Sequence, residues 1–121
     1  MPSVKIRYRS AIVTEDVVNQ LSHLLPNIVA EALTCEDPKG ELLANDVEVY
    51  PRRFSELDRS AYDLELTVEL NQYKSRLATL EQRTHCIAYD IRRLFDDIYG
   101  DGVRPKSWVW VRVCPGEWVE I

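Results

Sequence analysis

Pro2 is the residue of this sequence whose position suggests chemistry most directly. A small second residue generally permits removal of Met1, which would leave Pro2 with a free secondary amine. An α-amine titrates near about 7.7–8.0, and burial lowers its pKa because desolvation disfavours the charged form. A neutral amine is a competent general base, and the proline ring limits its orientation. The competing interpretation is that Met-Pro is a frequent start without functional meaning.

Other candidates for chemistry are few. The sequence has no G-x-x-x-x-G-K-[ST] phosphate loop and no G-x-S-x-G nucleophile motif. Gly100 and Gly102 follow a predicted helix, whereas a dinucleotide-binding loop precedes one. His23 and His85 are the only histidines, and Cys86 adjoins His85. Neighbours on a helix diverge by about 100°, so these two side chains cannot chelate one ion together. We therefore expect no metal and no cofactor.

The composition is typical of one ordinary domain, 1–121. A length of 121 residues with 45% hydrophobic content fits a single core. The formal net charge of −5 argues against binding to nucleic acid or to an anionic membrane. No apolar run approaches the roughly 20 residues of a membrane span, and the charged start is unlike a signal peptide. Three cysteines without a CxxC pair are typical of reduced thiols, so we expect a cytoplasmic protein.

Hydrophobic periodicity predicts six elements. Four segments alternate apolar and polar residues and predict strands: Ser3–Arg9, Asp46–Tyr50, Asp63–Leu70 and Ser107–Cys114. A helical pattern follows the N-cap Thr14 as far as Ala32, and a second runs from Leu77 to Ile98, with Gly100 as its C′ residue. The order β-α-β-β-α-β predicts an α+β fold, a four-stranded sheet with two helices on one face.

Two topologies satisfy this order. In the ferredoxin-like sandwich, the second and third strands pair antiparallel. In the alternative, each half is a parallel βαβ unit and a pseudo-twofold axis relates the two. The connection Pro51–Tyr62 is long for a hairpin, whose loops usually have about 2–5 residues, and this favours the second solution.

The sheet face without helices is unusual because it combines charges with two tryptophans. We expect it to carry Lys5, Arg7, Arg9, Glu48, Glu65, Glu69 and Arg112, with Trp108 and Trp110. Opposite charges on neighbouring strands can pair, and the default interpretation is a solvated face. Two tryptophans are costly to leave wet, so we expect a subunit, a ligand or the C-terminal tail to cover them.

A Met-Pro start that leads into a short alternating strand, within this element order, resembles the tautomerase superfamily. That group contains 4-oxalocrotonate tautomerase, 5-carboxymethyl-2-hydroxymuconate isomerase and macrophage migration inhibitory factor. The length matches the members with two fused βαβ units. The resemblance covers the whole chain in element order, but in motif only Met1-Pro2 and the strand after it. It implies a homotrimer whose sheets line a central barrel, with Pro2 as the general base that moves a proton across an enol.

The resemblance also implies substrate-binding residues. Residues of the last strand reach the proline pocket in the longer members, which here means Trp108, Trp110 and Arg112. Members that act on dicarboxylates tend to carry an arginine in the second strand. Here that position looks like Glu48, which would raise the pKa of the Pro2 amine or serve as an acid. Arg52, just past the second strand, could replace the missing arginine, unless it belongs to a solvated loop.

Together these features predict a tautomerase-like isomerase that acts on a small enolisable carbonyl compound. Pro2 would be its base, and the substrate its only small-molecule partner. The alternative is a non-catalytic binding or assembly module, either ferredoxin-like or a tautomerase scaffold that has lost its activity. Strand pairing separates the two topologies, because a ferredoxin-like fold pairs the second strand with the third.

Overall fold

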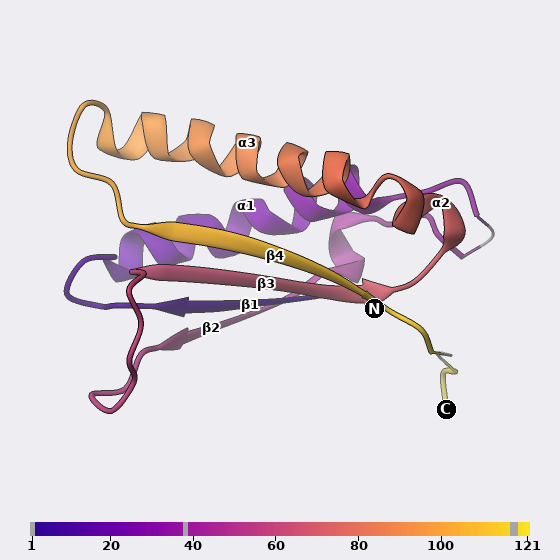
Figure 1. The fold of residues 1–121 in the computed structure, drawn as a ribbon, viewed down its shortest axis with the longest axis horizontal. Helices are drawn as coiled ribbons and strands as arrows, with labels where there is room; N and C mark the ends of the chain where they lie inside the picture. Colours follow the sequence, from indigo (N-terminus) through magenta and orange to yellow (C-terminus); the bar gives the residue numbers. More distant parts are fainter. Residues whose placement is uncertain (1, 38, 117–118) are drawn as a thin grey trace.

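The structure is a computed structural model that describes residues 2–37, 39–116 and 119–121. A four-stranded sheet forms one layer, and the helices cover one of its faces (Figure 1). The elements in chain order are β1 (Ser3–Tyr8), α1 (Glu15–Leu33), the 3-10 helix η1 (Ala44–Asp46), β2 (Glu48–Arg53), β3 (Leu64–Asn71), α2 (Lys74–Ala78), α3 (Leu80–Tyr99) and β4 (Ser107–Cys114). The predicted α+β fold is confirmed, with the second helix divided into α2 and α3.

Strand pairing decides between the two topologies. The strand order is β2-β1-β3-β4. β1 pairs parallel with β2, and β3 pairs parallel with β4, whereas β1 and β3 run antiparallel at the centre of the sheet. Consecutive strands β2 and β3 are therefore not neighbours, and the ferredoxin-like alternative is wrong. The structure confirms the tautomerase-like arrangement of two parallel βαβ units about a pseudo-twofold axis.

The core lies between the sheet and the helices. Alternate residues of β1 and β3 point into it, and α1 and α3 each add one apolar stripe. Burying one such aliphatic side chain contributes about 1.5–3 kcal/mol. The fully buried aliphatic residues are Val4, Ile6, Val13, Leu21, Leu25, Val29, Leu33, Leu64 and Ile87.

Helix α1 has a cap from its own sequence at one end only. At its start, the Thr14 hydroxyl accepts a hydrogen bond from the Val17 amide at 3.4 Å, as the sequence predicts. Its last turn contains no basic residue. Instead, Arg83 of α3 donates to the Ala32 carbonyl at 3.0 Å, and Arg76 of α2 donates to the Leu33 carbonyl at 2.8 Å. The second half of the chain therefore satisfies carbonyls at the end of the first helix.

The second strand is the largest correction to the predicted boundaries. The predicted strand Asp46–Tyr50 is shifted to Glu48–Arg53, because Asp46 closes η1 and accepts the Leu43 amide at 2.8 Å. Pro51 lies inside β2 and opposite Ile6 of β1. A proline has no N–H to donate, and it is tolerated here because β2 is an edge strand. None of the helices in the described parts of the chain is long and apolar enough to cross a bilayer.

Candidate functional site

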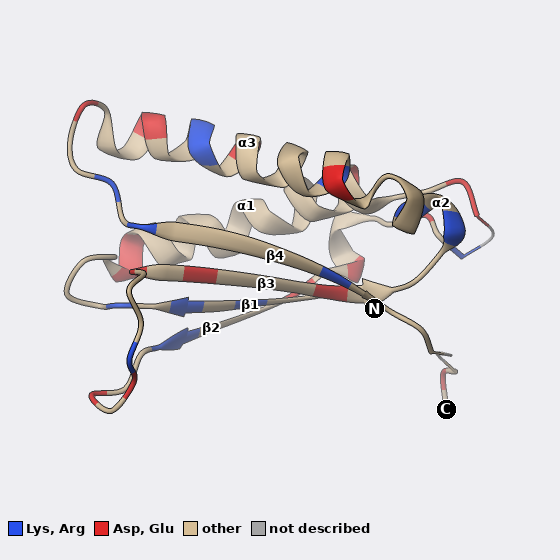
Figure 2. Ribbon diagram, in the orientation of Figure 1, with Lys and Arg blue, Asp and Glu red and all other residues tan. Residues whose placement is uncertain are grey.

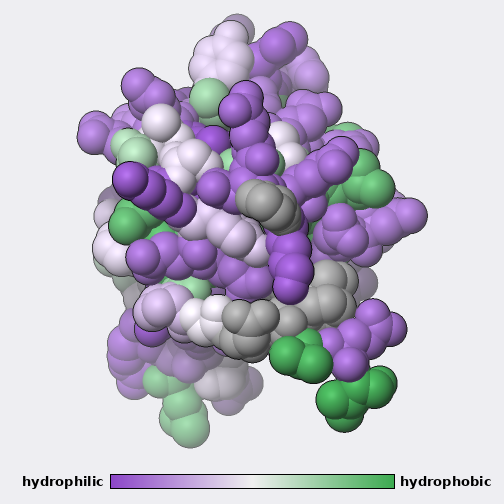
Figure 3. All heavy atoms as spheres, turned by 90° about the vertical axis from the view of Figure 1, so that its right-hand side faces the viewer, coloured by the Kyte–Doolittle hydropathy of each residue, from purple (hydrophilic) through white to green (hydrophobic). Residues whose placement is uncertain are grey.

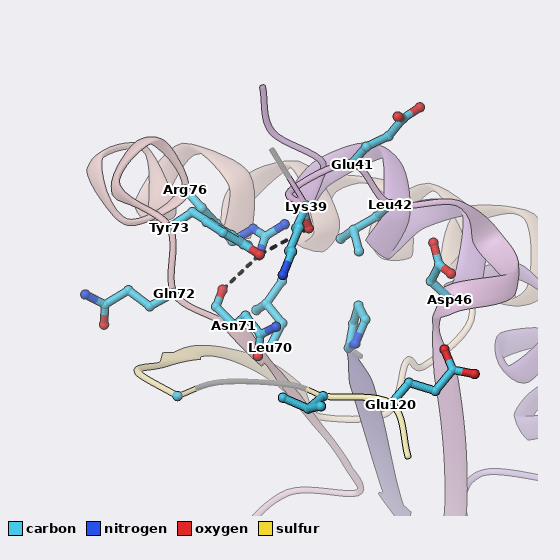
Figure 4. Close-up of a pocket in the computed structure, with 13 residues that line it drawn as sticks. Lys39, Glu41, Leu42, Asp46, Leu70, Asn71, Gln72, Tyr73, Arg76 and Glu120 are labelled. Atoms are coloured by element: carbon cyan, nitrogen blue, oxygen red, sulfur yellow. Dashed lines mark hydrogen bonds between the residues drawn. The ribbon is translucent and has the colours of Figure 1, made fainter. Parts of the chain in front are cut away.

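Pro2 is one of the residues that line a cavity at one end of the sheet. Figure 4 shows this cavity. The residue is buried, and its carbonyl accepts a hydrogen bond from the Glu48 amide at 3.0 Å. Because β1 and β3 are antiparallel, the start of β1 lies beside the end of β3, so Leu70 and Asn71 line the same cavity. The cavity has a volume of about 820 Å³, which is within the range of small-molecule sites.

Arg76 forms part of the cavity wall and is the one buried charged residue among those described. Its side chain is 1% exposed, and its guanidinium donates to three main-chain carbonyls: Leu33 at 2.8 Å, Asn71 at 2.8 Å and Gly40 at 2.9 Å. The guanidinium also lies over the Tyr73 ring, 5.0 Å from its centroid. Burial lowers the pKa of Arg76, yet a guanidinium remains charged in proteins.

The loop after α1 contributes a second cation. Lys39 has a φ of 95°, in the left-handed region that non-glycine residues rarely adopt. Two side chains hold this loop: the Tyr73 hydroxyl donates to the Lys39 carbonyl at 3.2 Å, and Arg76 binds the Gly40 carbonyl. The Lys39 side chain extends into the cavity (Figure 4). The backbone strain at Lys39 is thus maintained by contacts that converge on this site.

The charged residues that line the cavity have both signs. Lys39 and Arg76 are basic, and Glu41, Asp46 and Glu120 are acidic. The carboxylates of Glu41 and Glu120 are directed away from the centre (Figure 4), and that of Asp46 accepts a hydrogen bond from the Leu43 amide at 2.8 Å. The surface at this end of the molecule is mostly hydrophilic, with smaller hydrophobic areas (Figure 3). Val119 also borders the cavity, and most of its side chain is exposed. Because the Lys39 side chain extends into the cavity, it can contact a small anion or a group that becomes negative during a reaction.

The sequence-predicted substrate-binding residues lie on another surface, the sheet face opposite the helices. The side chains of this open face come from the exposed side of each strand, as the strand register shows. Two of the predicted residues belong to β2 and three to β4: Glu48, Arg52, Trp108, Trp110 and Arg112. β2 and β4 are opposite edges of the sheet, three strand spacings or about 14 Å apart.

Within one chain, the two predicted groups of residues remain separate. None of the five borders the Pro2 cavity among the described lining residues, and Pro2 is on the helix-facing side of β1. Glu48 is the predicted residue nearest to Pro2 in the strand register, because it lies opposite Ser3 of β1. Its carboxylate accepts a hydrogen bond from the Tyr50 hydroxyl on the open face. This hydrogen bond raises the pKa of Tyr50. A site that joins Pro2 to the β4 residues remains a prediction that requires more than one copy of the chain.

Sequence analysis missed three residues that the structure assigns to the Pro2 cavity: Lys39, Tyr73 and Arg76. Each resembles an ordinary surface residue in the sequence. One signal was available for the latter two: if the first and third strands pair antiparallel, the residues after Leu70 must lie near Pro2. No comparable signal marks Lys39, because the conformation of its loop depends on tertiary contacts.

Metal-ligating side chains are scattered in the described part of the chain, where no three of His, Cys, Asp and Glu gather. The three cysteines, Cys35, Cys86 and Cys114, are free. Cys86 is exposed on α3 because the apolar stripe of this helix passes through Ile87 and Ile91.

Solved structures that are similar to this one include the following two. The crystal structure of native Ps01740 covers 98% of this chain and 99% of its own, with a TM-score of 0.61 and 14% sequence identity, a likeness that shows the fold. The crystal structure of N1, a member of the cis-3-chloroacrylic acid dehalogenase (cis-CaaD) family, covers 98% of this chain and 79% of its own, with a TM-score of 0.49 and 18% identity. No family model and no curated protein matches the sequence.

Proposed function

We propose that this chain is a tautomerase-like isomerase that moves a proton on a small enolisable carbonyl compound, with Pro2 as the base. The observation that carries the proposal is the place of Pro2: it is buried, it heads the central strand β1 and it borders a cavity of about 820 Å³. The hydrogen bond from the Glu48 amide to the Pro2 carbonyl fixes the main chain next to the nitrogen.

The residues that line the cavity support such a reaction. Lys39 and Arg76 line it together with Pro2, and nearby cations disfavour protonation of an amine. In the ketonisation direction, the neutral nitrogen takes the proton of the enol hydroxyl, and the oxygen of the substrate becomes negative. Lys39 is the cation that stabilises this oxygen, because Arg76 is committed to main-chain carbonyls. The protonated amine then delivers the proton to a carbon of the enolate, which leaves the ketone and the neutral amine.

Replacing Pro2 with alanine tests the role of the ring. The variant retains a terminal amine but loses the constraint on its orientation, so kcat/KM should fall by about 100-fold. Ketonisation of phenylenolpyruvate or 2-hydroxymuconate is the measurement, and Ser3→Ala is the control on the neighbouring residue. Equal activity of Pro2→Ala and the unaltered chain would contradict the proposal.

We further propose that the open face is covered by other copies of the chain in a homotrimer. The charges in the middle of the face are matched: Lys5 pairs with Glu69 at 4.0 Å and Arg7 with Glu65 at 3.8 Å (Figure 2). Trp110 on the edge strand β4 is 62% exposed, which is costly for so large an apolar side chain. Assembly would bury Trp110 and would bring Trp108 and Arg112 toward a neighbouring copy.

Replacing Trp110 with glutamate should convert the assembly to monomers, because burying an unpaired charge in the interface is unfavourable. Sedimentation velocity measures the change. Tyr89→Ser on α3 is the matched control, since Tyr89 is 58% exposed on the opposite side of the molecule and should leave the assembly intact. An unchanged sedimentation coefficient for Trp110→Glu would rule out the open face as the interface.

The free cysteines fit a reducing compartment, and we propose a cytoplasmic location.

A further inference from the structure

A second cavity lies between α3 and β4, which run alongside each other (Figure 1). Its volume is about 590 Å³. It borders the beginning of β4 at Ser107, whereas the Pro2 cavity borders the other end of the parallel pair, at Asn71 of β3. The two cavities share no lining residue among those that the structure describes, so the second, the α3–β4 groove, is a separate site.

The floor of the α3–β4 groove is apolar and partly aromatic. Leu66, Ile91 and Phe95 are each at most 5% exposed and form part of the core. Trp108 of the edge strand β4 also borders the groove, although its side chain belongs to the open face. Because the three floor side chains are already ordered by the core, a flat apolar ligand would bind with little rearrangement. A cavity of this size and lining is suited to a small molecule.

The ionisable residues that line the groove are all basic residue types. They are His85 and Arg92 of α3 and Arg104 of the loop before β4, and none of the described lining residues is acidic. This is a marked departure in a chain whose formal net charge is −5. Arg104 is held by an ion pair with Asp96, just outside the groove. Arg92 is exposed and makes no ion pair within the described residues, so its guanidinium is available to a ligand.

We propose that the α3–β4 groove binds a small aromatic carboxylate. The ring lies against Ile91 and Phe95 on the floor of the groove, and the carboxylate accepts hydrogen bonds from Arg92 and from Arg104. This site is independent of the proposed isomerase activity, since it uses neither Pro2 nor Lys39.

Binding of 2-naphthoate to the full chain, measured by isothermal titration calorimetry, tests the site. This probe has an aromatic body and one carboxylate, and it cannot enolise. We expect saturable binding that Arg92→Gln weakens about tenfold. Arg93→Gln is the matched control: it makes the same charge change on the next residue of α3, but Arg93 contacts Tyr89 and does not line the groove. The control should bind as the unaltered chain does.

Three results would overturn the proposal. The first is the absence of saturable binding, as when a second copy of the chain fills the groove. The second is an equal loss for Arg92→Gln and Arg93→Gln, which would show attraction by net charge alone. The third is a loss for Lys39→Gln without a loss for Arg92→Gln, which would locate the probe in the Pro2 cavity. Loss of isomerase activity in Pro2→Ala leaves the proposal unaffected, because that variant retains the groove.

Discussion

Replacing Arg76 with methionine should lower the free energy of unfolding by about 4 kcal/mol. Methionine fills much of the same volume but donates no hydrogen bond, so the carbonyls of Leu33, Gly40 and Asn71 lose their partner. A buried acceptor left unsatisfied costs about 1–3 kcal/mol, and hydrogen bonds from a charged donor are among the stronger ones. Removing a buried charge is itself favourable and offsets part of this cost. The expected loss is therefore smaller than the sum for three unsatisfied carbonyls.

Guanidinium chloride denaturation measures this loss as a lower midpoint with an unchanged slope. Arg93→Met is the control, because Arg93 is exposed and should change the free energy of unfolding by less than about 0.5 kcal/mol. Arg76→Lys retains the charge but loses the planar guanidinium that reaches three carbonyls. Its loss in the free energy of unfolding should lie between those of Arg93→Met and Arg76→Met. A loss below about 1 kcal/mol for Arg76→Met would show that water or local movement satisfies these carbonyls.

Blocking the Pro2 nitrogen should abolish isomerase activity, with a loss in kcat/KM of about 1,000-fold or more. A glutamine inserted between Met1 and Pro2 is too large to permit removal of Met1, and it turns the Pro2 nitrogen into an amide. An amide nitrogen is not a base, so the whole contribution of general-base catalysis is lost, typically about 100- to 10,000-fold. Met1 lies outside the described residues, and intact mass therefore accompanies the kinetic assay as the measurement of its removal.

The extended chain carries its own control. Proteolytic removal of the extension, so that Pro2 again comes first, should restore activity without any change in the rest of the sequence. The extension should also leave the denaturation midpoint unchanged, because no core residue is altered. Full activity of a chain whose mass shows the extension intact would exclude Pro2 as the base, whatever the effect of Pro2→Ala.

The fold could be predicted from the sequence because its signals are local and repeat in both halves. The alternation of apolar and polar residues predicted the observed bounds of β4, Ser107–Cys114. The N-cap residue Thr14 likewise predicted the start of α1. The length of the connection after β2 was enough to favour the correct strand pairing. The predicted end of β2 was wrong because a proline usually interrupts a strand. Pro51 is tolerated inside β2 only because β2 lies at the edge of the sheet.

The candidate site was predictable only in part. Pro2 could be identified because its chemistry depends on its place in the chain. The environment of Arg76 could not, since its acceptors are main-chain carbonyls up to 43 residues away, and a carbonyl has no sequence signature. Trp108 and Trp110 lie on the sheet face that the sequence predicts for them, and their separation from Pro2 follows from the strand order. Side-chain type indicates which chemistry is available, whereas strand order determines which groups meet.

The arginines at the end of α1 make the repeated architecture asymmetric. Arg76 and Arg83 both come from the second βαβ unit, and they satisfy the last carbonyls of the helix in the first. Carbonyls at the end of α3 are instead satisfied locally, because the Gly100 and Gly102 amides donate to the carbonyls of Asp96 and Tyr99. The end of α1 therefore depends on the second unit, and local unfolding of α2 and α3 should loosen the first unit as well.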